Sequence, residues 1–408
     1  MKENIQIVFG LLGGLAVFIY GMNMMSECLQ KSAGDKMKSI LALLTKNPIL
    51  GVLAGALTTA VLQSSSATTV MAIGFVSAGL MNLPQAISII FGANIGTTMT
   101  AQIIAFKISD YIYVIIFIGF LISFVTKSEK VKSIGQTIFA FGLLFLGIET
   151  MGDVMKPLAS SPVFTDLIGR VAHIPVLGVA VGTVMTLVVQ SSSATIAVLQ
   201  NFASQPGPDG VTSILGLAGA IPILLGDNIG TTITALLASI GQSKDAKRTA
   251  VAHCIFNISG CFLFIWFVKP FAALIQNISP KGPEIEAISR QIANAHTVFN
   301  ITMTLIWVCL IKLMVKIVMT LIPDGKKGVE DPGSPIYLDE NIISQPAAAL
   351  QLVAKEIFRM SDQVRDILKK TIELVKNEEV KSIDGLKENG EQVERLGKCI
   401  TEYLAALF

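Results

Sequence analysis

A short polar box inside an apolar stretch is the feature that most restricts how this chain can fold. Residues 63–69 read Gln-Ser-Ser-Ser-Ala-Thr-Thr, and residues 190–195 repeat the pattern as Gln-Ser-Ser-Ser-Ala-Thr. Each copy is followed by a second box, Gly-Ala-Asn-Ile-Gly-Thr-Thr at residues 92–98 and Gly-Asp-Asn-Ile-Gly-Thr-Thr at residues 226–232. Two kinds of polar element that recur in the same order indicate an internal duplication that carries a site.

The composition places this chain in a membrane. Of its 408 residues, 52% are hydrophobic and 15% are charged, which is too apolar for a soluble protein. Acidic residues outnumber basic ones only after residue 322, so a small soluble domain is expected to follow the membrane part. The cysteines show neither paired nor metal-ligand spacing and are interpreted as packing residues: Cys28, Cys254, Cys261, Cys309 and Cys399.

Apolar runs predict the membrane spans. A bilayer core of about 30 Å needs about 20 apolar residues per helical span. The first run is no signal peptide, because it is too long and no small-residue cleavage site follows it. We expect spans at residues 5–25, 84–106 and 111–125, then at residues 134–155, 215–240 and 251–278, and one additional helix at residues 296–322.

Two further apolar segments are interrupted by the polar boxes. Residues 49–80 and 175–203 are each split into limbs that are too short to cross the bilayer comfortably. Non-helical backbone is tolerated at membrane depth only where it is buried in protein or lines a cavity. Both segments are therefore predicted to be re-entrant helical hairpins.

The repeat plan predicts an inverted topology. The first repeat (residues 1–126) and the second (residues 134–278) each hold about three spans and one hairpin, and an odd number of spans makes the second repeat enter from the opposite side. Three loops carry at least three Lys or Arg residues each and are expected in the cytoplasm: residues 31–47, 127–133 and 241–249. The chain is thus predicted to be a multi-pass protein of the cytoplasmic membrane.

A linker at residues 323–344 leads to a predicted helical domain at residues 345–408 in the cytoplasm. In its first helix an apolar stripe follows spacings of three and four, with Thr371 in the seam: Leu350, Val353, Ile357, Met360, Val364, Ile367 and Leu374. A second amphipathic helix runs to Phe408 without a cap, so we expect this domain to be incomplete.

The chemistry of the serine boxes favours an anion. A half-helix that begins inside the membrane points its unpaired amides and its positive dipole end at whatever occupies the break. Serine hydroxyls and glutamine amides add hydrogen-bond donors. We therefore predict an oxyanion site made of Gln63, Ser64, Ser65, Ser66, Gln190, Ser191, Ser192 and Ser193.

Neither serine box contains Lys or Arg, so a multiply charged oxyanion at midplane needs another source of positive charge. Co-bound sodium ions can supply it, and hard cations take oxygen ligands. The second boxes offer such oxygens at Asn94, Thr97, Thr98, Asn228, Thr231 and Thr232, and Thr68 and Thr195 are supporting residues. Helix packing is the alternative for small residues here, and for Gly51, Gly55, Gly178 and Gly182 it is the preferred interpretation.

Asp227 breaks the symmetry of the repeat, because its counterpart is Ala93. An ionisable residue at membrane depth is a functional candidate, so Asp227 is predicted to be a cation ligand or a proton carrier. A carboxylate satisfied by backbone amides at a helix end is the alternative. A further echo places His and Asn four residues apart, at His253 and Asn257 and again at His296 and Asn300, where polar contacts between helices are favoured over a direct site role.

These residues resemble the motifs of the type II sodium/phosphate cotransporters and their bacterial relatives, which often carry a C-terminal PhoU-like helical domain. The resemblance rests on both kinds of box, on Phe-Asn-Ile-Ser-Gly at residues 256–260 and on His-Thr-Val-Phe-Asn at residues 296–300, and it covers about residues 10–322. It implies that the serine boxes bind phosphate and sodium, which adds Gln63 and Gln190 to the sodium ligands. It also implies that residues 345–408 are PhoU-like.

The function predicted from the sequence is sodium-coupled secondary transport of inorganic phosphate, by rocking or hairpin gating around a midplane site. No enzymatic chemistry and no cofactor other than the coupling ion are expected. The expected partners are phosphate, sodium and membrane lipid, not nucleic acid, and a homo-oligomer is left open. The alternatives are a membrane phosphate sensor that signals through the C-terminal helices, and a channel.

Overall fold

The computed structural model describes residues 2–33, 47–77, 80–106, 111–159, 174–207, 209–323, 333–338, 343, 346–376 and 383–407. Within these ranges the chain is helical, and the β-structure is limited to one isolated bridge between Pro206 and Ser213. The described part holds six segments long and apolar enough to cross a membrane: Gln6–Leu29, Leu83–Ile104, Glu129–Met155, Gly216–Ala238, Lys244–Ile278 and Glu284–Cys309. The prediction of an all-α membrane protein is confirmed.

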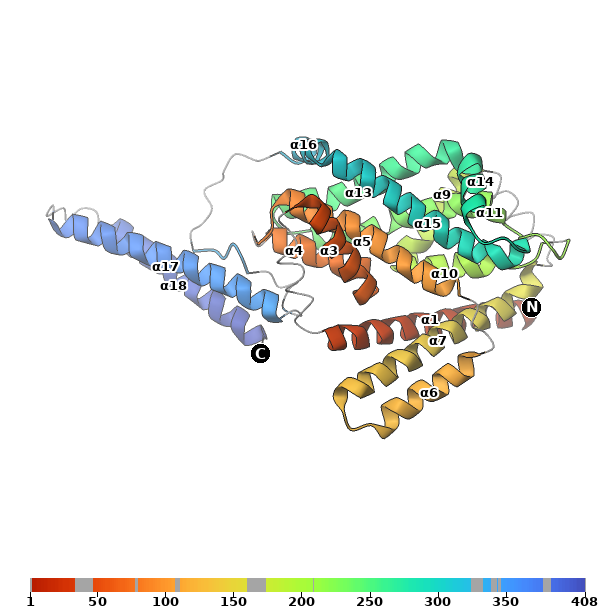
Figure 1. Ribbon diagram of the computed structural model, residues 1–408. Coiled ribbons are helices and arrows are strands. Elements are labelled where there is room, and N and C mark those ends of the chain that lie inside the picture. The colour runs from red at the N-terminus through yellow and green to blue at the C-terminus, as the bar shows by residue number, and fades with distance from the viewer. Residues whose placement is uncertain are drawn as a thin grey trace.

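Three helices form a layer at one side of the molecule (Figure 1). In this layer α7 (Glu129–Ala159) lies between α1 (Lys2–Ala33) and α6 (Ile112–Val125). Large apolar side chains cover the outer surface of α6, including Phe117 at 62% and Phe124 at 76% exposure, as expected for a helix that faces lipid.

Glycines let α1 and α7 approach closely. A Cβ on Gly14 would lie 2.9 Å from the carbonyl oxygen of Gly147, and a Cβ on Gly21 would lie 2.8 Å from the backbone nitrogen of Leu144. Since the partner number falls as the α1 number rises, the two helices run antiparallel.

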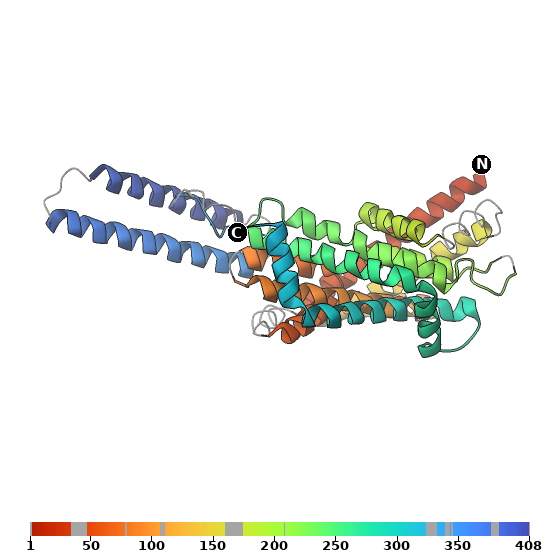
Figure 2. The ribbon, with the colours of Figure 1, turned by 90° about the horizontal axis from the view of Figure 1, so that it is seen from above.

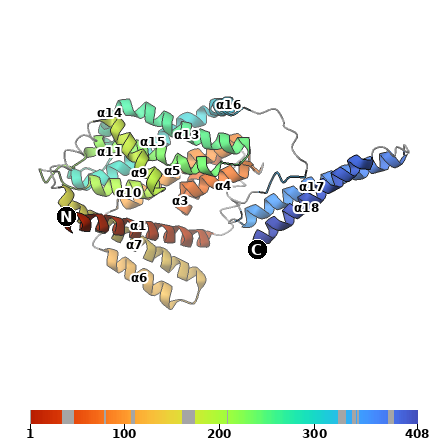
Figure 3. The ribbon, with the colours of Figure 1, turned by 180° about the vertical axis from the view of Figure 1, so that it is seen from behind.

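The remaining membrane helices form a larger body, which lies against this layer when the molecule is seen from behind (Figure 3). Its core contains aromatic pairs with centroids 5.0 Å apart: Phe91 and Phe256 are stacked, and Phe264 and Phe299 meet edge to face. The helices of this body are α3 (Pro48–Leu62), α4 (Ser65–Ser77), α5 (Leu83–Ile104), α9 (Pro175–Val189), α10 (Ser192–Ala203), α11 (Gly216–Gly230), α12 (Thr232–Ala238), α13 (Lys244–Phe264), α14 (Val268–Ile278), α15 (Glu284–Cys309) and α16 (Ile311–Leu321).

Both apolar segments that carry a serine box are broken at the box. The limbs α3 and α4 have 15 and 13 residues, and α9 and α10 have 15 and 12. At 1.5 Å per residue, a helix of this length falls short of a bilayer core of about 30 Å. The predicted splits are therefore present, and whether each pair re-enters the membrane belongs to the proposal below.

Each broken segment packs on the next helix in the same way. A Cβ on Gly92 of α5 would lie 1.9 Å from the Val52 oxygen of α3, and a Cβ on Gly226 of α11 would lie 2.0 Å from the Val179 oxygen of α9. A Cβ on Gly55 or on Gly182 would lie as close to the oxygen of Ile89 or of Ile223, at 2.1 and 1.9 Å. Gly55 and Gly182 are therefore packing residues, as their spacing indicated.

The additional helix expected at residues 296–322 has different bounds. α15 begins at Glu284, and a separate helix, α16, follows it after Cys309. The prediction began at His296 and so left out the charged residues that precede it. In the structure, Glu284 and Glu286 occupy the first turn, where the helix dipole favours acidic side chains, and Arg290 donates to Gln102.

Two other predicted spans are interrupted. α11 and α12 meet at Thr231, and a 3-10 turn at Ile265–Phe267 separates α13 from α14. The repeat plan also matched residues 251–278 with residues 111–125, but their surroundings differ. Among the described residues α6 packs chiefly on α7, whereas α13 packs on α4, α5, α11 and α12.

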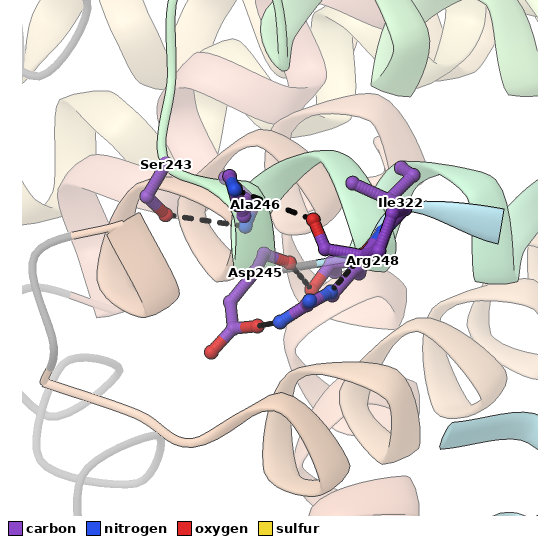
Figure 4. A network of polar contacts seen from close by, with 8 residues as sticks. Ser243, Asp245, Ala246, Arg248 and Ile322 are labelled. Carbon is purple, nitrogen blue, oxygen red and sulfur yellow. Dashed lines mark hydrogen bonds and ion pairs between the residues drawn. The ribbon is translucent and has the colours of Figure 1, made fainter. Parts of the chain in front are cut away.

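One end of the larger body is fixed by a polar network (Figure 4). The buried Arg248 donates from Nε to the Ile322 carbonyl at 2.9 Å and from Nη1 to Asp245 at 2.7 Å. Close by in the chain, the Ser77 hydroxyl donates to Gln242 at 2.8 Å. The ends of α4, α12 and α16 and the start of α13 therefore share one side of the molecule.

The opposite end is held by Gln200 and Arg290. The Gln200 side chain donates to the carbonyls of Ala101 at 3.1 Å and Ser289 at 2.9 Å, and Arg290 donates to the Gln102 side chain at 2.7 Å. The ends of α5 and α10 thus meet the start of α15 at this side.

The two amphipathic helices expected after the linker are present as α17 (Pro346–Lys376) and α18 (Ile383–Leu407), which extend away from the body as a pair (Figure 2). Of the linker, residues 333–338 and 343 are described. Apolar residues of the pair, including Leu352 and Leu396, form a cluster against which Phe75 and Leu80 pack. The pair therefore contacts the end of α4.

Candidate functional site

Both helix breaks have the same backbone geometry. Gln63 and Gln190 end α3 and α9 in the left-handed region, with φ of 52° and 58°, and they are the only non-glycine residues of the described chain with positive φ. Ser64 and Ser191 then accept, through their hydroxyls, the backbone N–H groups of Ala67 and Ala194, each at 3.2 Å. The serines cap the helices that follow, α4 and α10.

The two breaks face one cavity of about 140 Å³. All eight residues predicted to hold the oxyanion line it: Gln63, Ser64, Ser65, Ser66, Gln190, Ser191, Ser192 and Ser193. Two segments more than a hundred residues apart in the sequence thus supply a single polar cavity. The rest of its lining comes from α1, as Met22, Asn23 and Ser26.

The two glutamines differ in their surroundings. Gln63 is 7% exposed, and its Oε1 accepts a hydrogen bond from Thr100 of α5 at 2.9 Å. Gln190 is exposed and donates to the carbonyl of Leu187. Thr234, the α12 counterpart of Thr100, lies 3.3 Å from the Ser66 hydroxyl instead. The α3–α4 pair is therefore contacted from both repeats.

Asp227 lies behind the second break, outside the cavity lining. Its side chain is fully buried, Oδ1 accepts from the Thr186 hydroxyl at 2.7 Å, and Oδ2 has no hydrogen-bond partner. The neighbouring Thr195 hydroxyl, 3.1 Å from Thr186, donates to the Ser191 carbonyl. A chain of polar groups thus connects this carboxylate with the break.

The asparagines of the second boxes are turned towards histidines. Asn94 Oδ1 lies 3.3 Å from His253 Nε2, and Asn228 Oδ1 lies 3.2 Å from His296 Nε2. Each histidine is followed one turn later by Asn257 or Asn300, whose amide donates to the histidine's own carbonyl. These contacts join α5 to α13 and α11 to α15, which agrees with the favoured role of the His and Asn pairs as polar contacts between helices.

The hydroxyls of the second boxes are engaged within their own helices. Each donates to a carbonyl three or four residues earlier, and none of them lines the cavity: Thr97, Thr98, Thr231 and Thr232. Thr68 likewise donates to the Ser64 carbonyl and contacts Thr59. Of the predicted sodium ligands, therefore, Gln63 and Gln190 are those found at the cavity.

Sequence analysis missed the contribution of α1. Asn23 and Ser26 are polar residues within an apolar run, three positions apart and so on one helix face. Polar groups at membrane depth are candidates for a site. The spacing of Asn23 and Ser26 could therefore have indicated a third wall of the cavity.

The fold defines a multi-pass membrane protein with a polar cavity among its helices. The chain belongs to the Na+/Pi-cotransporter family, whose sequence model matches it twice, at residues 17–153 and 147–279. The double match agrees with the internal duplication, and membership confirms the resemblance drawn from the motifs. The chain is thus a member of a family of sodium/phosphate cotransporters.

Named relatives are similar over different lengths. Uncharacterized protein YqeW of Bacillus subtilis is 34% identical over 263 residues, which is 64% of this chain and 83% of that protein. The "Putative inorganic phosphate export protein YjbB" of Salmonella typhimurium is 24% identical over 401 residues, 97% of this chain and 70% of that protein. Sodium-dependent phosphate transport protein 2A of Rattus norvegicus is 39% identical over 99 residues, 23% of this chain and 15% of that protein. No solved structure matches this chain.

Proposed function

We propose that this protein is a sodium-coupled secondary transporter that carries inorganic phosphate across the cytoplasmic membrane. The observation that carries the proposal is the convergence of both serine boxes on one cavity. Hydroxyl donors and the first amides of α4 and α10 suit an oxyanion there.

Sodium coupling follows from what the cavity lacks. Among the described residues its lining contains no Lys, Arg or His, so a bound phosphate meets no opposite charge from these side chains. Removing such an anion from water without a counter-charge costs several kcal/mol. Sodium ions bound beside it offset that cost, and a relative is named as a sodium-dependent phosphate transport protein.

We propose an inverted arrangement of the two repeats, with α3–α4 and α9–α10 as re-entrant hairpins entering from opposite sides. The antiparallel contact of α1 and α7, the repeat-related first helices, supports this. Equivalent packing of α3 on α5 and of α9 on α11 supports it too. Rocking or hairpin gating then opens the cavity alternately to the two sides of the membrane, and this movement carries the substrates across.

We propose the cytoplasm for the side that holds Gln242, Ile322 and the α17–α18 pair. The basic loops at residues 127–133 and 241–249 fall on this side by the positive-inside rule, whereas residues 34–46 lie outside the described part. In this proposal the repeats are residues 1–126 and 134–278, and the additional span is residues 284–309. Residues 345–408 are predicted to be PhoU-like.

A phosphate sensor is the second candidate. The observation in its favour is the contact of Phe75 and Leu80 with the apolar cluster of α17 and α18. Because α4 begins at the cavity, that contact gives a bound anion a physical route to the C-terminal helices.

Uptake of labelled phosphate into proteoliposomes tests the proposal. A transporter concentrates phosphate inside when sodium is higher outside, and the accumulation disappears when potassium replaces sodium. A sensor binds phosphate without flux, and a channel gives flux that stops at equal concentrations. Loading sodium inside instead measures the opposite direction, which the name of the Salmonella typhimurium relative makes relevant.

A further inference from the structure

The α1 wall of the cavity carries oxygen atoms to which the proposed function gives no role. Ser26 donates from Oγ to the carbonyl of Leu62, the last residue of α3. Asn23 is an exposed residue that lines the same cavity, and within the described part of the chain its side chain makes no hydrogen bond. An amide that faces a binding cavity in this way is available to a ligand.

The two ends of the broken helix attract opposite charges. The start of α4 carries the positive end of its helix dipole, whereas the end of α3 carries the negative end and carbonyls that the helix itself does not use. The contact between Ser26 and Leu62 puts the α1 residues at the end of α3. A cation is therefore favoured at the α1 wall, beside an anion at the start of α4.

The cavity also has to supply the oxygens for a coupling ion from its own lining. Asn94 Oδ1 is occupied by His253, and the box threonines donate within their helices. The lining offers neutral oxygen from amides, hydroxyls and the carbonyls at the end of α3, and its described residues include no Asp or Glu. Neutral oxygens suit a monovalent hard cation better than a divalent one, which is usually bound through carboxylates.

We propose that Asn23 is a ligand of a sodium ion bound between α1 and the end of α3, adjacent to the oxyanion. This assignment rests on the proposed function, because it gives the coupling ion its position. α1 belongs to the three-helix layer and α3 to the larger body, so the ion joins the two parts of the molecule across the cavity.

The repeat does not provide a second copy of this site. The residues of α7 that correspond to Asn23 and Ser26 are Glu149 and Gly152, and neither lines the cavity. A Cβ on Gly152 would instead meet the side chain of Asn201 at 3.0 Å. The site is thus specific to α1.

The test compares Asn23→Leu and Asn23→Asp with the wild type and with Tyr20→Phe, a change at an α1 residue that is 64% exposed and outside the cavity. Phosphate uptake is titrated with sodium in proteoliposomes, and the melting temperature of the purified protein is followed with sodium or potassium. We expect Asn23→Leu to weaken the apparent sodium affinity by about tenfold, or about 1.4 kcal/mol, while phosphate affinity at saturating sodium is kept. Asn23→Asp, which retains an oxygen ligand and adds a negative charge, should bind sodium at least as well as the wild type, and Tyr20→Phe should behave as the wild type.

Unchanged sodium activation in Asn23→Leu would overturn the assignment. So would a loss of phosphate affinity at every sodium concentration with sodium activation intact, because Asn23 would then be a donor to the anion. If Asn23→Leu does not fold, weakened sodium activation in Asn23→Asp rejects the site.

Failure of the proposed function is separable from failure of this site. If the wild type carries phosphate without sodium, coupling is wrong, and the melting temperatures decide the site alone. If sodium, but not potassium, raises the melting temperature of the wild type and Asn23→Leu abolishes that increase, the site is supported. If sodium does not raise the melting temperature of the wild type, the site is rejected.

Discussion

The hydroxyl of Thr186 lies 2.7 Å from Oδ1 of Asp227, across the contact between α9 and α11. In the first repeat the matching Thr59 pairs with Thr68 at 2.8 Å, and Ala93 takes the place of the carboxylate. The threonine pair is thus common to both repeats, and the charge is a feature of the second. Packing shared by the two repeats accounts for the threonine pair, whereas the carboxylate of Asp227 needs a test of its own.

Asp227→Asn keeps the size and one oxygen of the side chain but removes its ability to ionise. If the carboxylate helps to hold sodium, the apparent sodium affinity falls by about tenfold and phosphate affinity falls less. Sodium titrations of phosphate uptake measure this. Asp227→Ala recreates the first repeat and is the control for folding.

Two other results would assign Asp227 differently. A flattened pH dependence of uptake with normal sodium activation would make it a proton carrier. Wild-type sodium activation together with a wild-type pH profile would leave it as a contact between α9 and α11.

Ser65→Ala and Ser192→Ala each remove a hydroxyl that lines the cavity. A phosphate oxygen left buried without that donor costs about 1 to 3 kcal/mol, so phosphate affinity should fall by about tenfold or more. Phosphate titrations at saturating sodium provide the measurement. Ser88→Ala removes a buried hydroxyl that bonds the Gln85 carbonyl outside the cavity, and it should leave affinity unchanged. Equal affinity in all three variants would assign the serines to helix packing.

Single cysteines at Thr126 and Lys281, placed in a background without the native cysteines, should react with an impermeant reagent from opposite sides of the membrane. Thr126 follows α6 and Lys281 follows α14, the final helices of the two proposed repeats. Thr126 should react from the cytoplasmic side. Reaction of both from one side would contradict the inverted arrangement.

Gly92→Ala and Gly226→Ala should prevent stable folding, because the new Cβ would lie within 2.0 Å of a backbone oxygen. The three atoms nearest to each new Cβ are all backbone atoms, so no side chain can move away to make room. Gly13→Ala is the matched control, since nothing lies within 4 Å of the position its Cβ would take, and Ala gains up to about 1 kcal/mol of helix propensity. Thermal unfolding of the purified proteins distinguishes them, and a folded Gly92→Ala variant with wild-type stability would refute the close packing.

The helix breaks, and their convergence on one cavity, could be predicted from the sequence, because a polar box inside an apolar run is hard to accommodate in an unbroken membrane helix. Gln63 and Gln190 mark both breaks, and the duplication predicted that the boxes form one site. Helix boundaries set by charge at the membrane surface were predicted poorly. Glu284 begins α15 because its carboxylate suits a first turn, whereas a count of apolar residues excludes it.

Tertiary contacts account for the rest of the differences. The local sequence does not predict that Asn94 contacts His253, nor that the threonines of the second boxes lie outside the cavity lining. The role of Asn23 depends on how α1 lies against the end of α3, which no periodicity encodes.

The left-handed conformation of Gln63 and Gln190 has a consequence for stability engineering. A residue with a Cβ costs about 1 to 2 kcal/mol in this region, and glycine would avoid most of that cost. Replacement by glycine would therefore relax both turns and at the same time delete the amides that face the cavity. A version of this protein stabilised by replacing its least favourable backbone positions would lose side chains of the proposed site, so stabilising changes are better sought at exposed helical positions such as Gly13.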